Sequence, residues 1–209
     1  METNWGNWIR NKYLGKFFLR YALVGFLIIG WVLQQERKKI WYSLQKKKKK
    51  IFWQAIKFLL FSALIHFILK YLFALMASSW PHKSEKINHL IAVINSRKED
   101  FWHFGLVFFG LCVLAPILEE CIFRKFVFSL FGRKNPLAYL FSFFSFILAH
   151  YHWGENIFVL FLQYSVASFA LIYIYKKSNW NLLSPILLHS LINLLFIGIT
   201  IFNPNCSLI

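Results

Sequence analysis

Cysteine is scarce in this sequence: Cys112, Cys121 and Cys206 are the only three among 209 residues. The number is odd, two of the three stand in apolar runs, and no CxxC pair occurs. A small fold held by disulfides needs an even set of cysteines, and a zinc ribbon needs closely spaced pairs. The sequence therefore indicates neither a disulfide framework nor a zinc ribbon.

Acidic side chains are also few, with 8 Asp and Glu against 24 Lys and Arg and a formal net charge of +16. The basic residues gather in short segments between apolar runs, as RKK at 37–39 and KKKKK at 46–50. Cytoplasmic loops of membrane proteins carry such an excess, and anionic lipid head groups attract it. No base-stacking or groove-reading module is visible. We therefore expect anionic lipids at the basic loops and no binding to nucleic acid.

Charged residues make up only 15% of the chain, whereas 58% of it is hydrophobic and 21% aromatic. Several mostly apolar runs reach the length of about 18 residues that marks a transmembrane candidate. We predict an all-α, multi-pass protein of a bacterial cell membrane, a polytopic bundle of about six to eight transmembrane helices around a polar intramembrane cavity. The expected helical segments are 15–33, 51–78, 101–132, 137–151, 156–175 and 182–202.

The segments between these helices divide the chain in two. Residues 1–100 are expected to form a transmembrane hairpin with a basic loop at 34–50 and a polar connecting segment, and residues 101–209 a helical core. The first apolar run lacks a small-residue cleavage site and is interpreted as a retained anchor. Counting basic residues places the loop at 34–50 in the cytoplasm. Pro116 predicts either a kinked helix or two helices that meet beside it.

Charged and polar residues interrupt the apolar segments at three places. They are Glu119, Glu120 and Arg124 in the first place, His150 in the second, and His189 with Asn193 in the third. Ionisable residues inside membrane segments usually face the bundle interior and mark function. The alternative is that they form hydrogen bonds that only hold helices together.

Helical geometry separates the two glutamates. Glu120 and Arg124 are four residues apart and share one face, so they can pair. Glu119 lies about 140° from Arg124 around the helix axis, which leaves its carboxylate harder to neutralise. Measured from the basic turn near residue 133, Glu119 and His150 lie about equally deep, roughly 21 Å away at 1.5 Å per residue. We expect these groups and His189 to meet in one cavity.

Three motifs occur in order along these segments: EECIFR fits EExxxR, FILAH fits FxxxH, and HSLIN fits HxxxN. In this respect residues 101–200 resemble the CPBP family. That family comprises type II CAAX prenyl endopeptidases and related Abi-like bacterial membrane proteins, including bacteriocin-processing and bacteriocin-immunity members. One departure is Lys125, where many members carry glycine after the arginine.

The resemblance implies an intramembrane endopeptidase that cleaves a membrane-associated, prenylated or leader peptide. By matching position, Glu119 would activate a water with the help of His150, and His189 and Asn193 would stabilise the oxyanion. Glu120 and Arg124 would support the site. A metal would have Glu119, His150 and His189 as zinc ligands. Because no HExxH occurs and Asn is an unusual fourth member, we favour catalysis without a metal or other cofactor.

Two other functions remain open at this level. A non-proteolytic immunity or scaffold protein of the same family would suit the short length and the divergent first half. A small transporter could use the buried carboxylate as a proton site, although neither a repeated half nor a pair of broken helices is visible. The sequence does not identify the substrate or the oligomeric state.

Overall fold

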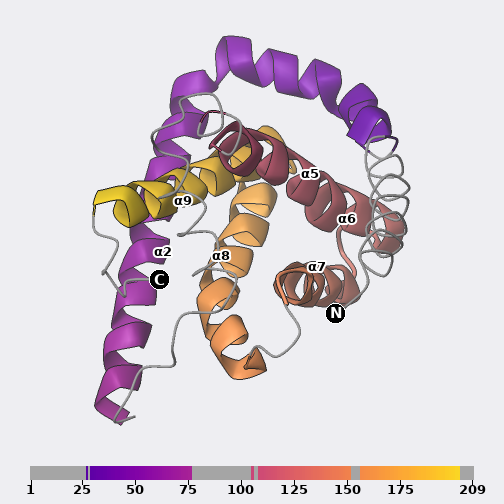
Figure 1. Cartoon of the computed structure of the whole chain (residues 1–209). Helices are drawn as coiled ribbons and strands as arrows, with labels where there is room; N and C mark the ends of the chain where they lie inside the picture. Colours follow the sequence, from indigo (N-terminus) through magenta and orange to yellow (C-terminus); the bar gives the residue numbers. More distant parts are fainter. Residues whose placement is uncertain (1–26, 28, 77–104, 106–107, 152–155, 203–209) are drawn as a thin grey trace, which may run out of the picture.

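The computed structural model describes residues 27, 29–76, 105, 108–151 and 156–202. Regular secondary structure in this part is helical, which agrees with the predicted all-α class. An unlabelled helix over 29–46 is followed by the elements drawn in Figure 1. They are α2 (Lys48–Met76), the π-helical segment η1 (Gly110–Leu114), α5 (Ala115–Glu120), the π-helical segment η2 (Cys121–Phe126), α6 (Val127–Phe131), α7 (Pro136–Ala149), α8 (Ile157–Lys177) and α9 (Leu183–Phe202).

The basic segment 34–50 is not a loop, as the sequence led us to expect, but mostly helix. Residues 29–46 form a helix that crosses one end of the bundle, and the chain then turns into α2 (Figure 1). Gln, Lys, Arg and Leu are good helix formers. In addition, Val32, Glu36 and Ser43 recur at near-helical spacing and are buried against the bundle. Tertiary contacts of this face therefore stabilise a helix in a segment whose many basic residues had suggested a loop. The expected span at 15–33 lies largely outside the described residues.

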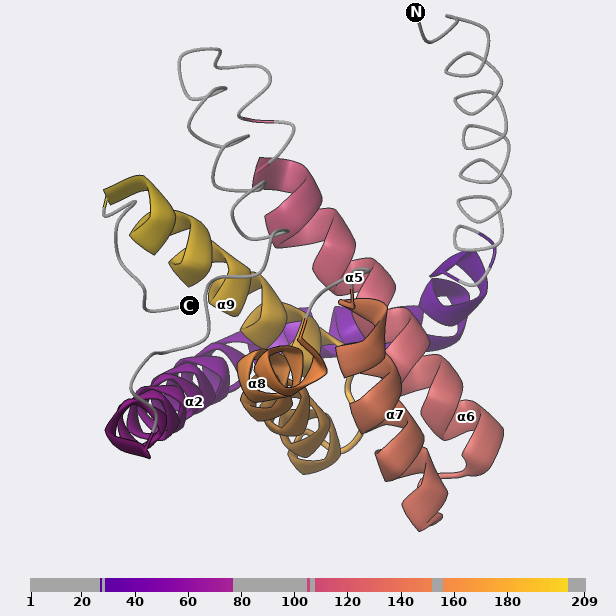
Figure 2. The same cartoon turned by 60° about the horizontal axis from the view of Figure 1, so that its bottom comes forward.

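The segment around Pro116 is a single helix and not two. The residues at each junction between η1, α5, η2 and α6 keep right-handed helical dihedrals. Figure 2 shows these elements as one unbroken helix, with α7 alongside α6. Pro116 is accommodated by a π turn placed just before it, where the Ala115 N–H donates to the Gly110 carbonyl. Such bulges widen a helix locally and are frequent at functional sites.

Asparagine begins each of the last three helices. The Asn135 side chain accepts a hydrogen bond from Leu137 N, that of Asn156 from Phe158 N, and that of Asn181 from Leu183 N. Each satisfies one of the N–H groups that a helix start leaves without an intrahelical partner. These caps fix where α7, α8 and α9 begin.

The helices pack around three clusters of buried residues. One cluster joins α2 to the last three helices through Ala55, Phe146, Leu171 and Leu188. Because α2 belongs to this core, the first hundred residues contribute to the same bundle as the segment that carries the motifs. The predicted boundary at residue 100 lies outside the described residues and stays a prediction.

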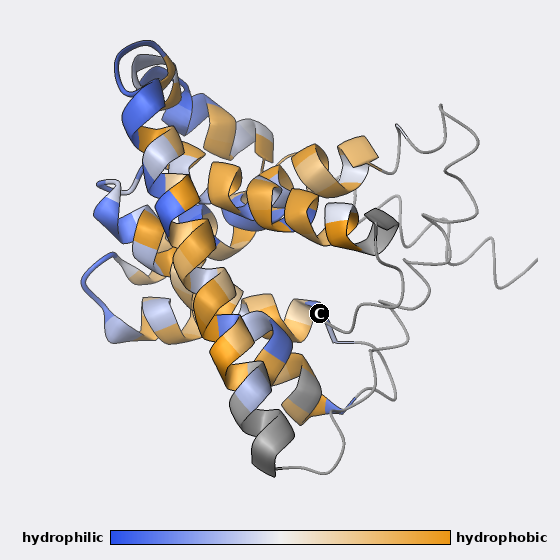
Figure 3. Ribbon diagram, turned by 90° about the vertical axis from the view of Figure 1, so that its left-hand side faces the viewer, coloured by the Kyte–Doolittle hydropathy of each residue, from blue (hydrophilic) through white to orange (hydrophobic). Residues whose placement is uncertain are grey.

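The outer surface of the bundle is apolar. Leu60, Leu64 and Phe67 of α2 and Leu140 and Leu148 of α7 are each more than half exposed. In Figure 3 apolar residues dominate the middle of the bundle, whereas hydrophilic residues gather toward one end. Among the described helices, α2 alone is long and apolar enough to cross a membrane, over Lys48–Leu69, and α7 and α9 contain shorter apolar stretches. Additional membrane passes stay a prediction.

A polar clasp ties the helix over 29–46 to the rest of the bundle. Glu36 forms an ion pair with Lys125 of η2, and both side chains are largely buried. Lys39 Nζ donates to the Asn179 carbonyl at 2.9 Å, in the turn after α8, and Asn181 donates to the Ser43 hydroxyl. Lys125, which stands where the CPBP pattern often has glycine, thus has a partner in the divergent first half of the chain.

The clasp makes Lys125 important for stability. In a Lys125→Met variant Glu36 stays buried without its counter-charge, so the free energy of unfolding should fall by about 1–3 kcal/mol. The measurement is thermal unfolding of the purified full chain in detergent. The exposed Arg37→Met on the same helix is the matched control and should change little. Glu36→Gln with Lys125→Met should cost less than the sum of the single changes, and additive losses would contradict the pairing.

Candidate active site

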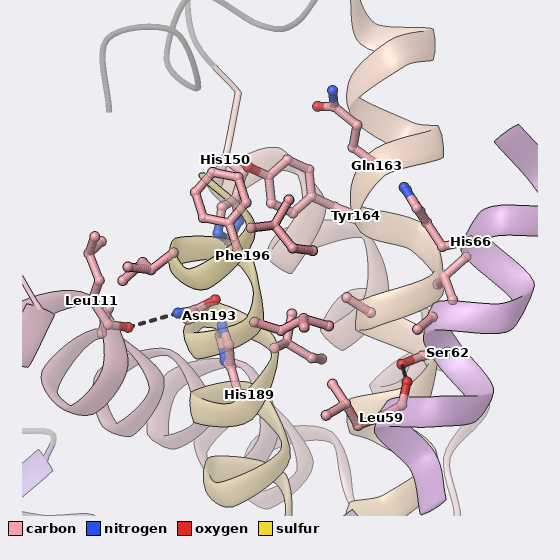
Figure 4. A pocket seen from close by; sticks show the side chains of 18 of the residues that line it. Leu59, Ser62, His66, Leu111, His150, Gln163, Tyr164, His189, Asn193 and Phe196 are labelled. Atoms are coloured by element: carbon pink, nitrogen blue, oxygen red, sulfur yellow. Dashed lines mark hydrogen bonds between the residues drawn. The ribbon is translucent and has the colours of Figure 1, made fainter. Parts of the chain in front are cut away.

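A pocket of about 480 Å³ lies inside the bundle between α2, α5, α8 and α9. Most residues that line it are apolar, so the cavity is polar along part of its wall only and not throughout. Glu119, His150, His189 and Asn193 line this pocket. Figure 4 shows how the last three lie relative to one another. The predicted site residues, drawn from three separate segments, are thus brought to one cavity.

Glu119 is at the centre of the polar wall. Its Oε2 atom lies 3.6 Å from His150 Nε2 and 3.8 Å from His189 Nε2. The side chain keeps 25% of its surface exposed, whereas that of its neighbour Glu120 is fully buried. Adjacent residues on a helix point about 100° apart. This rotation places one glutamate at the pocket and the other inside the protein.

Glu120 is enclosed by two partners. Its Oε2 lies 3.2 Å from Arg124 Nε, four residues along, and both side chains are fully buried. The Arg124 guanidinium also lies 4.3 Å from the centre of the Phe146 ring. The second carboxylate oxygen of Glu120 is 2.9 Å from His189 Nδ1. Sequence reasoning paired Glu120 with Arg124 only, because a contact between residues 69 positions apart leaves no local pattern.

Both imidazoles are held by their Nδ1 atoms. His150 Nδ1 lies 2.8 Å from the Phe146 carbonyl, which can only accept a hydrogen bond. That carbonyl is available because the His150 backbone N–H donates to Ile147 and Leu148 instead of Phe146. Fixing one ring nitrogen in this way sets the tautomer of the other. The hydrogen of a neutral His150 therefore sits on Nδ1, and its Nε2 lone pair faces Glu119.

The same reasoning applies to His189. The Glu120 carboxylate lies 2.9 Å from Nδ1, so in the tautomer whose hydrogen is on Nδ1 the Nε2 atom is an acceptor. The Nε2 atoms of both rings and the Glu119 Oε2 atom therefore converge on one wall of the pocket. Such a set is suited to hold a group that brings its own hydrogens, for example a water molecule or an added proton.

Glu119, His150 and His189 are also the three residues that would have to hold a zinc ion. In the part of the chain that the structure describes, no three His, Cys, Asp or Glu side chains are arranged to hold a metal ion. Although Glu119, His150 and His189 lie close together, their geometry in the described part of the chain does not meet what a zinc ion requires. We derive no step through a metal ion.

Asn193 forms a hydrogen bond to a backbone carbonyl that is available because of Pro116. Its Nδ2 atom donates to the Leu111 carbonyl at 2.8 Å (Figure 4). In a regular helix the Ala115 N–H would serve this carbonyl, but it donates to Gly110, and Pro116 has no N–H to offer. Asn193 thus satisfies a carbonyl that the π turn releases, and Nδ2 keeps a second hydrogen. The expected row of two donors, His189 and Asn193, is therefore partly occupied by protein partners.

Several pocket residues were missed by sequence reasoning or interpreted differently. His66 of α2 lines the pocket together with Ser62. Tyr164 of α8 lies against His150 with ring centres 4.3 Å apart. Gln163 lines the pocket beside it. No motif flags a single Gln or Tyr in an apolar run, and only the packing of α2 on α8 and α9 brings them to the site. His152 lies outside the described residues.

Known proteins resemble the chain in its second half and beyond. Residues 101–195 match the family model "Type II CAAX prenyl endopeptidase Rce1-like". This range contains the six polar residues predicted from the sequence to form the site, Glu119, Glu120, Arg124, His150, His189 and Asn193. The UPF0177 protein YaiF of Lactococcus lactis subsp. lactis (strain IL1403) is 34% identical over 161 residues, which cover 73% of this chain and 68% of that protein.

The UPF0177 protein YajF of the same organism is 29% identical over 166 residues, which cover 78% of this chain and 76% of that protein. No solved structure matches the chain. The matched segment contains the buried pair, the two histidines and the pocket carboxylate described above. The chain therefore belongs to the UPF0177 proteins and carries an Rce1-like domain of the type II CAAX prenyl endopeptidase (CPBP) family.

Proposed function

We propose that the chain is an intramembrane endopeptidase that hydrolyses a peptide bond of a membrane-associated peptide, prenylated or carrying a leader. The observation that carries this proposal is the position of Glu119 Oε2, 3.6 and 3.8 Å from two histidine Nε2 atoms inside a largely apolar pocket. A carboxylate with limited access to solvent is suited to take a proton from water. The family that residues 101–195 match is named for this class of reaction.

A multi-pass membrane location agrees with the surface of the bundle. Soluble proteins rarely expose contiguous apolar patches as extensive as those on α2 and α7, whereas lipid solvates them without cost. Basic side chains gather at one end: Arg133 lies over Trp180, and Lys176 over Tyr139. Lys39 joins them in the clasp. We propose that this end faces the cytoplasm and anionic lipid head groups.

In the proposed reaction Glu119 takes a proton from the water, whose oxygen then attacks the carbonyl carbon of the peptide. His189, protonated at Nε2, donates to the oxyanion together with the remaining hydrogen of Asn193 Nδ2. The Glu120 carboxylate beside Nδ1 stabilises the imidazolium form of His189. When the C–N bond breaks, the proton held by Glu119 passes to the leaving nitrogen through His150. The products are a carboxylic acid and an amine, and no other reactant is needed.

The two adjacent glutamates provide the central test. Glu119→Gln removes the base but keeps shape and hydrogen-bonding capacity, so we expect cleavage to fall by at least about 10²-fold, the lower end of what general base catalysis contributes. The assay uses the full chain in nanodiscs with a fluorescence-quenched farnesylated CAAX peptide. Thermal unfolding should be unchanged. Cleavage that persists at the wild-type rate would reject the mechanism.

Glu120→Gln serves as the matched variant one residue away. It leaves the Arg124 charge fully buried without a carboxylate and replaces the carboxylate that faces His189 Nδ1 by a neutral amide. Breaking a buried ion pair on one side costs about 3–5 kcal/mol. We therefore expect a marked fall in the melting temperature of this variant, in contrast to Glu119→Gln. Equal stability of the two variants would contradict the division of roles between them.

The metal-free mechanism is tested by chelation. Exhaustive treatment of the purified protein with EDTA and 1,10-phenanthroline should leave the rate of peptide cleavage unchanged. Loss of cleavage on chelation, followed by its return when zinc is added, would overturn the mechanism in favour of a zinc site.

The non-proteolytic alternative, an immunity or scaffold protein, differs in what it requires of Glu119. Binding to a bacteriocin or a membrane partner depends on surfaces and not on a base in the pocket. If cells that express the Glu119→Gln variant keep the protection conferred by the wild type, the binding function gains support over the peptidase.

A further inference from the structure

Gln163 lies in the pocket without a role in the chemistry above. It belongs to α8 and lines the same cavity as Glu119, next to Tyr164. Both polar atoms of its amide, Nε2 and Oε1, are buried and have no hydrogen-bond partner among the described residues. In Figure 4 its side chain stands at the end of the pocket where His150 and Tyr164 lie.

A buried amide without partners is unfavourable, because it has lost its hydrogen bonds to water and gained none in the protein. Leucine would fill the same space on this apolar wall without that loss. Polar groups that help to hold helices together have partners within the protein, as Glu120 has in Arg124 and His189. Gln163 lacks this feature, so its amide calls for a partner that is not part of the chain.

The chemistry of a primary amide narrows the choice of partner. It offers two N–H donors on one side and a carbonyl with two lone pairs on the other. A peptide group carries the complementary pair, a carbonyl that accepts and an N–H that donates. A lipid tail offers neither, and a carboxylate or phosphate offers acceptors only. An extended peptide backbone can therefore satisfy both ends of the Gln163 amide.

The position of Gln163 relates this contact to the reacting groups. The next residue, Tyr164, packs on the His150 ring with centres 4.3 Å apart, and His150 Nε2 is 3.6 Å from the Glu119 carboxylate. A backbone held at Gln163 thus enters the pocket at the His150 end.

On the basis of the proposed peptidase function, we propose that Gln163 binds a backbone amide of the substrate a short distance from the bond that is cleaved. It acts as a substrate-positioning residue and sets which peptide bond reaches Glu119. The contact recognises the backbone and not a side chain, so it restricts the register of the peptide without dictating its sequence.

The test combines stability with binding. Gln163→Leu should melt at the wild-type temperature or above it, because no hydrogen bond within the protein is lost. Its affinity for a fluorescent farnesylated CAAX peptide should fall about tenfold or more. The binding is measured by fluorescence anisotropy on the full chain in nanodiscs, in a Glu119→Gln background so that no cleavage occurs. Gln54→Leu in α2, a partly buried glutamine that does not line this pocket, is the matched control.

A series of ester-containing peptides identifies the contact itself. Each peptide replaces one backbone N–H by oxygen, which removes one donor and leaves the side chains unchanged. At one position the ester should weaken binding to the protein with Gln163 about tenfold and have no such effect on the Gln163→Leu variant. This coupling between substrate atom and side chain is not expected from a residue that only supports the fold.

The outcomes separate the two proposals. If Gln163→Leu melts several degrees below the Gln54→Leu control, or binds the peptide as well as the control does, the positioning role is wrong. If the coupling to one ester is found but the protein with Glu119 intact does not cleave the bound peptide, the peptidase proposal fails while the backbone contact stands.

Discussion

The ion pair of Glu120 and Arg124 is the interaction on which the site depends, because both charges are fully buried among apolar helices. Such a pair usually gains little net stability over apolar residues of the same size. Its effect is positional. Arg124 lies against the Phe146 ring on α7, and Glu120 reaches His189 on α9. One carboxylate therefore fixes the orientation of an imidazole that comes from a different helix.

Two irregularities in the helices also help to hold the side chains of the site in position. The π turn before Pro116 leaves the Leu111 carbonyl to Asn193, and the tightened last turn of α7 leaves the Phe146 carbonyl to His150. In each case a backbone group that a regular helix would use internally accepts a hydrogen bond from a residue of the site. The rigidity of the polar wall therefore comes from the backbone as well as from the buried charges.

Local geometry explains what could be predicted from the sequence. The pairing of Glu120 with Arg124 follows from a spacing of four residues, and the meeting of Glu119 with His150 was expected from their similar depths along their helices. The contact of His189 with Glu120 could not be predicted, since it depends on the rotation of α9 about its own axis. The helix over 29–46 was missed because its high charge masked an inward face that only the bundle can satisfy.

The different environments of Glu119 and Glu120 show how one dipeptide can serve two purposes. Both residues would be costly to bury alone, and the rotation of about 100° between them decides which one meets a counter-charge. Glu120 receives Arg124 and His189, and its charge is thereby fixed. Glu119 faces the Nε2 atoms of His150 and His189 at 3.6 and 3.8 Å. The same helix turn thus encloses one carboxylate among protein partners and leaves its neighbour 25% exposed at the pocket.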